Sequence, residues 1–94
     1  MNIEYKPNAL NTIYELAYFI EIKNTKGSGN RFIDKLFDHI EKYALPNVNY
    51  ALCRYSIFNS LGYSCVFYND WVIAFKIINN TFIVYEVALG TNFY

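Results

Sequence analysis

The sequence predicts an α+β fold: an N-terminal strand, then an antiparallel helical hairpin packed on one face of a small, mainly antiparallel β-sheet. Two stretches in the first half repeat apolar residues at helical spacing, and three runs in the second half are rich in β-branched and aromatic residues. At 94 residues the chain has room for a single domain, residues 1–94, built around one core.

The predicted first strand and first helix meet at Pro7. Residues 2–6 alternate in character, and proline suits the first position of a helix because that position needs no backbone N–H. From Asn8 to Lys23 apolar residues recur at steps of three and four, as one helix face requires: Ala9, Ile13, Leu16, Ala17 and Ile20. The helix is expected to be well covered, because further apolar residues widen this stripe: Leu10, Tyr14, Phe19 and Ile22.

A turn at residues 25–29 should return the second helix antiparallel to the first, with Asn30 as its N-cap. The second helix has the cleanest apolar stripe, and Pro46 is expected to end it: Phe32, Ile33, Leu36, Phe37, Ile40, Tyr43 and Ala44. His39 falls on the polar face. It is expected to be solvent-exposed, because no residue at helical spacing could share a metal with it.

Residues 47–62 suit both a short helix and an extended segment, and they are expected to be irregular with a helical turn. Residues 63–68 read as a strand, and Asn69 and Asp70 form a turn. The strand order is then sequential through residues 71–78 and 81–89, and the first strand should join at an edge or beside the last strand.

Asn79 and Asn80 separate the last two strand runs and favour a tight primed turn, because asparagine tolerates the positive φ angles of such turns. A two-residue loop fixes the cross-strand partners as Ile78–Thr81, Ile77–Phe82, Phe75–Val84, Ile73–Glu86, Lys76–Ile83 and Ala74–Tyr85. Both faces of this hairpin are mostly apolar. We therefore expect a helical cover on one face, and more core or a partner protein on the other.

Composition limits the classes of function. The chain carries eight basic and eight acidic residues, so it lacks the basic surplus typical of proteins that grip phosphates. No apolar run is long enough to span a membrane and no signal peptide precedes the domain, so a cytoplasmic protein is expected. Cys53 and Cys65 are expected to be buried thiols, and the sequence predicts no metal site and no cofactor.

The chain resembles the RelE/ParE superfamily of bacterial toxins, which include plasmid stabilisation proteins. The resemblance rests on element order and on residues 3–5, 7–9, 30–32, Ile20, Pro46, Leu89 and Gly90. It implies the toxin component of a type II toxin-antitoxin system, held inactive by a cognate antitoxin protein. RelE-like members cut messenger RNA on the ribosome with basic residues, whereas ParE-like members bind DNA gyrase.

Two cations of the RelE pattern are absent, because Val72 follows the first hairpin aromatic and Thr91 follows Gly90. The remaining catalytic candidates are Lys76, Arg54 and Tyr94. Each candidate also has an interpretation without a catalytic role. Lys76 would be an ordinary strand lysine, Arg54 a surface or helix-capping cation, and Tyr94 a residue at the chain end. The ParE-like function is therefore predicted first, with an atypical RelE-like endoribonuclease as the alternative.

Antitoxins of this family wrap the toxin with a helix and an extended segment, so the resemblance also implies a groove lined by apolar residues from the first helix and the hairpin. Its candidate lining residues are large aromatics of the hairpin and tail: Trp71, Phe75, Phe82, Tyr85 and Phe93. The alternative is that they belong to the core. A third hypothesis is a toxin fold without toxicity that serves as an interaction or dimerisation module, and a homodimer stays open.

Overall fold

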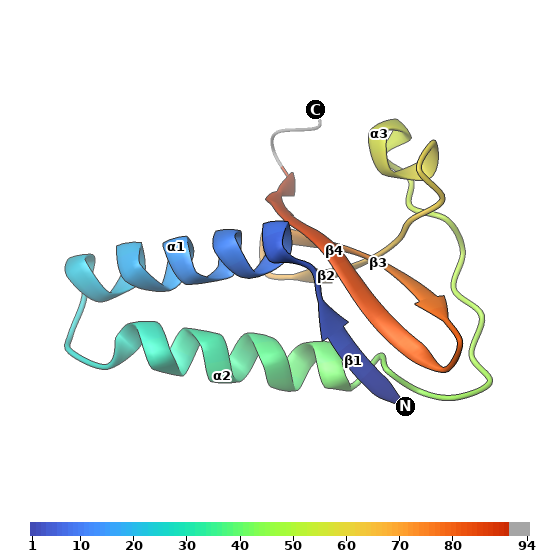
Figure 1. Ribbon diagram of the computed structural model, residues 1–94. Coiled ribbons are helices and arrows are strands. Elements are labelled where there is room, and N and C mark those ends of the chain that lie inside the picture. Colours follow the sequence, from blue (N-terminus) through green and yellow to red (C-terminus); the bar gives the residue numbers. More distant parts are fainter. Residues whose placement is uncertain (91–94) are drawn as a thin grey trace.

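A computed structural model of the chain describes residues 1–90 and confirms the α+β class (Figure 1). The elements follow in the order β1 (Asn2–Tyr5), α1 (Pro7–Lys23), α2 (Ser28–Glu41), α3 (Ser56–Asn59), β2 (Ser64–Tyr68), β3 (Trp71–Ile78) and β4 (Thr81–Leu89). The helical turn expected between residues 47 and 62 is α3. Helix α2 ends at Glu41, earlier than predicted, and the chain continues to Ala44 through shorter i→i−3 hydrogen bonds.

The four strands form one sheet in the order β1-β4-β3-β2. The last three strands are a sequential antiparallel meander, and β1 lies at the edge, parallel to β4. The first strand therefore takes both predicted positions, since it is at an edge and beside the last strand. Lys6 N–H continues this pairing by donating to Val84 O at 2.8 Å.

The paired asparagines form the predicted turn, with φ angles of 51° at Asn79 and 58° at Asn80. Next to the turn the register is as predicted, up to the pair Phe75–Val84. Beyond that pair the prediction is wrong, because a β-bulge makes Ala74 pair with Glu86 and leaves Tyr85 as an extra residue. As a consequence Val87, and not Glu86, lies opposite Ile73.

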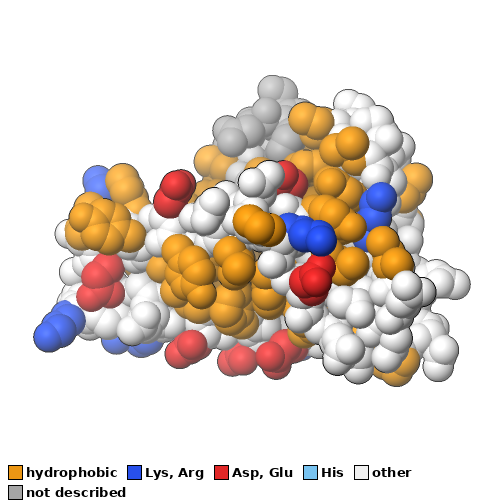
Figure 2. Space-filling view, viewed as in Figure 1, with side chains coloured by type: hydrophobic (Ala, Val, Ile, Leu, Met, Phe, Trp, Pro, Cys, Tyr) orange, Lys and Arg blue, Asp and Glu red, His pale blue; other side chains and the backbone are white. Residues whose placement is uncertain are grey.

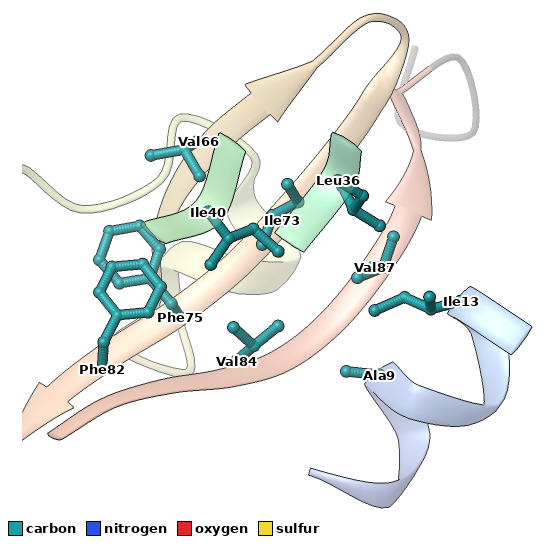
Figure 3. Close-up of a cluster of buried hydrophobic side chains, with 10 residues drawn as sticks. All are labelled: Ala9, Ile13, Leu36, Ile40, Val66, Ile73, Phe75, Phe82, Val84 and Val87. Carbon is teal, nitrogen blue, oxygen red and sulfur yellow. The ribbon is translucent and has the colours of Figure 1, made fainter. Parts of the chain in front are cut away.

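The main core lies between the helices and one face of the sheet, as Figure 3 shows. The rings of Phe75 and Phe82 stack with centroids 4.2 Å apart. The other fully buried large side chains of this core are Ile13 from α1, Leu36 and Ile40 from α2, and Ile73 and Val84 from the hairpin. The predicted helical cover is thus confirmed.

The opposite face of the hairpin is covered in part by the chain itself. Cys53, Tyr55 and Phe58, from the segment that includes α3, pack on Val72 and Ala74 of β3. The expectation of two buried thiols is wrong, because Cys53 and Cys65 form a disulfide that ties this segment to β2. The separation of 12 residues did not by itself reveal that the segment containing α3 returns and brings Cys53 beside Cys65.

Helix α2 begins differently from the prediction. Asn30 lies inside the helix. The residue that precedes the helix is Gly27, which has a φ of 86°. The free N–H groups of this end donate to Glu21 of α1: Gly27 N–H to Oε2 at 2.7 Å and Gly29 N–H to Oε1 at 2.8 Å. A carboxylate from the neighbouring helix therefore caps α2.

His39 is half-buried, which corrects the expectation of a solvent-exposed side chain. Its Nε2 donates a hydrogen bond of 2.7 Å to Phe67 O, and its ring packs against Tyr43 and Tyr68. The residue thus joins α2 to the edge strand β2 and has a structural role.

Candidate functional site

One candidate surface lies on α1. The C-terminal part of this helix and the start of α2 project beyond the strands (Figure 1). Four large side chains, each more than half exposed, make up what we call the α1 face: Tyr14, Tyr18, Phe19 and Ile22. Figure 2 shows hydrophobic side chains gathered over the helical hairpin. This apolar surface has no cover among the described residues.

The geometry of the α1 face follows from helical spacing. Tyr14, Tyr18 and Ile22 follow one another at four-residue steps and so form one continuous stripe, with Phe19 beside it. The ammonium of Lys23 lies 4.9 Å from the Phe19 ring centroid and places a positive charge at the end of the stripe. A partner helix or loop would meet aromatic rings edged by a cation.

The two helices hold this face rigidly at its outer end. A shallow groove of about 390 Å³ lies between them, lined in part by Tyr14, Tyr18 and Ile33. The capping bonds from Gly27 and Gly29 lower the pKa of the Glu21 carboxyl, and the charge of Arg31 lowers it further. An ionised Glu21 is therefore favoured, and it fixes the turn that joins the helices.

A second candidate surface lies on the sheet face away from the helices. The rings of Tyr63 and Tyr85 stack with centroids 4.8 Å apart on the face that also carries Lys76. The Lys76 ammonium lies 5.4 Å from the Tyr63 centroid and 5.9 Å from that of Tyr85, and the Lys6 ammonium lies 5.8 Å from that of Tyr85. We call these four residues the tyrosine–lysine cluster.

Acidic groups border the tyrosine–lysine cluster. Glu86, held by a 3.3 Å hydrogen bond from Asn8 Nδ2, stands beside Tyr63. Desolvation raises the pKa of the Tyr63 hydroxyl, and the nearby charges of Glu86 and Tyr85 raise it further. The hydroxyl is therefore neutral at physiological pH and can donate a hydrogen bond. Stacked rings next to ammonium groups suit a flat or anionic ligand.

The structure separates the predicted site residues. Lys76 and Tyr85 come together in the tyrosine–lysine cluster. Arg54 lies over the rings of Tyr55 and Phe67, at 5.1 and 5.4 Å from their centroids. Its guanidinium also donates a 3.1 Å hydrogen bond to the Tyr55 hydroxyl.

The predicted aromatic lining does not form one groove. Phe75 and Phe82 are fully buried and stack in the core, so they are unavailable at the surface of this structure. Trp71 is half-buried and packs against the same core. Phe93 and Tyr94 lie outside the described residues.

The first helix was expected to give apolar residues to a partner groove, but it was also expected to be well covered, and the exposure of the α1 face shows that the second expectation is wrong. The contributions of Lys6 and Tyr63 were missed by sequence reasoning. A signal for the α1 face was present, because α1 carries apolar residues nearly all round, whereas α2 separates its apolar and polar faces. An apolar helix of that kind is fully covered or has a face left for a partner. The tyrosine–lysine cluster depends on where Lys6 and Tyr63 come to lie in the folded chain, because Lys76 and Tyr85 already share one face of the hairpin in the predicted register.

Within residues 1–90 no group of three histidine, cysteine, aspartate or glutamate residues is placed to hold a metal ion. None of the helices described there is long and apolar enough to cross a membrane. No protein-family model matches the chain, and a comparison with curated proteins gives no significant match.

Proposed function

We propose that this protein is the toxin component of a type II toxin-antitoxin system, ParE-like, which binds a protein target such as DNA gyrase and is neutralised by a cognate antitoxin. The observation that carries this proposal is the α1 face, with exposed fractions of 68% at Tyr18 and 59% at Ile22. Contiguous apolar surface rimmed by polar groups is typical of protein–protein interaction sites.

The residue types of the α1 face fit a binding surface. Tyrosine is enriched among the residues that dominate interface energies, because a large ring buries much area at a small cost in conformational freedom. The helix that carries this face is packed against α2 and joined to it at the outer end by the Glu21 cap. A rigid presentation lowers the entropy cost of binding. The element order of the RelE/ParE superfamily, which the chain shares, supports the toxin assignment.

The proposal is tested by expression without a partner, followed by a growth assay and a gyrase supercoiling assay on purified protein. Growth arrest and inhibition of supercoiling are expected for the wild type. Ile22→Lys should abolish both, because a charge that is buried against an apolar partner stays unpaired. The matched control is Ile57→Lys, since Ile57 of α3 is 56% exposed and lies away from the α1 face. Harmless expression without gyrase binding contradicts the proposal and favours the non-toxic interaction module.

A second candidate is a RelE-like endoribonuclease with an atypical site, and the tyrosine–lysine cluster favours it. Cleavage by the 2′-hydroxyl needs cations beside the phosphate and groups that transfer protons. Lys6 and Lys76 would supply the cations, Tyr63 a proton donor, and Glu86 a base.

This candidate predicts cleavage of ribosome-bound transcripts after induction. The cleavage should fall by about 10²–10³-fold in Lys76→Ala, as loss of a charge-stabilising donor does in other enzymes. Ile22→Lys should leave the cleavage unchanged, because it lies on the α1 face. Intact transcripts after wild-type induction would exclude the endoribonuclease.

A further inference from the structure

Strand β3 is longer than the strand beside it. The first residue of β2, Ser64, pairs with Phe75, so β3 continues for three residues, Lys76 to Ile78, beyond the end of β2. On their other side these three residues stay paired with β4. Within residues 1–90 no strand occupies the place next to them on the β2 side. The sheet therefore has a short open edge along β3, where β3 extends past the first residue of β2.

The backbone of Ile77 faces this open edge. In an antiparallel pair the residues alternate between those that exchange hydrogen bonds with the partner and those that point the other way. The pair that closes a two-residue turn exchanges bonds, so Ile78 and Lys76 bond to β4. It follows that the N–H and the C=O of Ile77 point toward the vacant position beside β3.

A groove of about 530 Å³ lies at this position. Figure 1 shows the connection from α2 to α3 passing the turn end of the β3–β4 hairpin, and residues 48–52 of that connection form the far wall. The lining is largely apolar and partly exposed, at 38% for Val48, 55% for Leu52 and 44% for Ile78. Among the described residues that line it, Lys76 alone is charged.

We propose that this groove binds an extended peptide segment of a partner protein, which adds a short strand beside β3. Its central residue would exchange two hydrogen bonds with Ile77, the residue opposite Ile78 would be apolar, and the residue opposite Lys76 would be acidic. Unpaired strand edges bind peptides in this way, with main-chain bonds giving affinity and side-chain pockets giving specificity.

Two observations favour a partner peptide over a second copy of this chain. Val48, Tyr50 and Leu52 wall the groove on its far side, and a second copy would have to bring past them the sheet that adjoins its own edge strand. Lys76 also selects for an acidic residue, since opposite charges stabilise a cross-strand pair. The proposal concerns a surface separate from the α1 face and does not depend on toxin activity.

The test is an NMR titration with hydrogen exchange on the purified full chain, using the acetylated and amidated peptide Thr-Val-Val-Glu as the probe, which ends at the residue opposite Lys76. In the free protein the Ile77 amide should exchange faster than the Phe75 amide, which has Ser64 opposite it. Addition of the probe should shift and protect the Ile77 amide. N-methylation of the second valine, which faces Ile77, should weaken binding about tenfold, because it removes one hydrogen bond and adds bulk.

A charge exchange gives an independent readout. Lys76→Glu should weaken binding of the probe by about two- to fivefold, and a probe with lysine in place of glutamate should recover it. The proposal is overturned if the Ile77 amide is as protected as that of Phe75 without probe, or if its protection rises with protein concentration. It is also overturned if millimolar probe leaves that amide unshifted. Growth arrest with no probe binding would remove this proposal alone, and probe binding by a harmless protein would remove only the toxin assignment.

Discussion

Replacing Gly29 by alanine should force α1 and α2 apart at their outer end. A Cβ atom at this position would stand 2.5 Å from the backbone oxygen of Ala17 on the facing helix and 3.2 Å from the carbonyl carbon of the same residue. It would also lie 3.2 Å from Glu21 Oε1, which caps α2. The contact is with backbone, so no side-chain rotation can relieve it.

The size of the effect follows from these distances. Ordinary contacts of a Cβ begin at 3.4 Å, so the helices must separate locally by 3.4 − 2.5 = 0.9 Å. Overpacking of this kind costs about 1–3 kcal/mol, and the better helix propensity of alanine returns up to about 1 kcal/mol. The expected net loss is about 1–2 kcal/mol. For a domain of this size each kcal/mol lowers the melting temperature by about 4–8 °C.

Urea denaturation followed by circular dichroism measures this loss. The matched control is Asn30→Ala, the next residue of the same helix turn, which is exposed and gains helix propensity without meeting α1. Gly29→Ala should unfold at a lower urea concentration than both the wild type and the control. If it proves as stable as Asn30→Ala, the close approach of the helices at Gly29, and the support it gives the α1 face, are refuted.

Three further changes test the remaining structure. Because capping holds the pKa of Glu21 below its ordinary 4.5, its stabilisation is complete above that pH and is lost as the pH falls through the lowered value. Glu21→Gln should thus be less stable at neutral pH and converge with the wild type in acid, with Glu15→Gln as the control. Phe82→Ala should lower the free energy of unfolding in urea by about 3–5 kcal/mol, because it removes a fully buried ring that stacks on Phe75. A smaller loss would show that Phe82 is not part of the core. Reduction of the Cys53–Cys65 disulfide should cost about 2–4 kcal/mol and loosen the cover on β3, and equal stability of the oxidised and reduced forms would show that packing alone holds the segment.

The register of the hairpin shows where sequence reasoning succeeds and where it stops. Asn79 and Asn80 prescribe the turn, because few residues accept two consecutive positive φ angles, and the pairs next to the turn follow by counting. Counting assumes one residue opposite one residue, and Tyr85 breaks that rule. The bulge is selected by packing, since it returns Val87 to the core face, where Glu86 would otherwise be buried.

The start of α2 marks a different limit. Asn30 is a good cap by its local chemistry, but the helix begins two residues earlier, and the carboxylate of Glu21 from α1 accepts the N–H groups of Gly27 and Gly29. Which group caps the helix depends on how closely the two helices approach, and Gly29 sets that distance. A cap supplied from another helix cannot be found by searching the residues just before the helix.

The candidate site was predicted only in part, because it too depends on which distant segments come together in the fold. Residue types identified aromatic anchors, but the relative extent of helices and sheet decides which aromatics are buried. Phe75 and Phe82 lie where the helices cover the hairpin, whereas Tyr18 belongs to the C-terminal half of α1, the part of the helix that extends beyond the strands in Figure 1. Lys76 was found because the RelE pattern expects cations near this hairpin strand, and Lys76 is one of the few basic residues that remain for that role. Its neighbours Lys6 and Tyr63 come from segments that only the folded chain brings together.

The separation of the two surfaces makes the functional variants interpretable. Ile22 lies on the part of α1 that extends beyond the sheet, so a charge there should alter binding without disturbing the core (Figure 1). Lys76 is different, because its ammonium lies over two stacked tyrosines and its stem lines the groove beside β3. A loss of activity in Lys76→Ala therefore indicates catalysis only if the Tyr63–Tyr85 stack persists. Near-ultraviolet circular dichroism, which reports on packed tyrosines, should be unchanged in that variant if the lysine acts on a substrate.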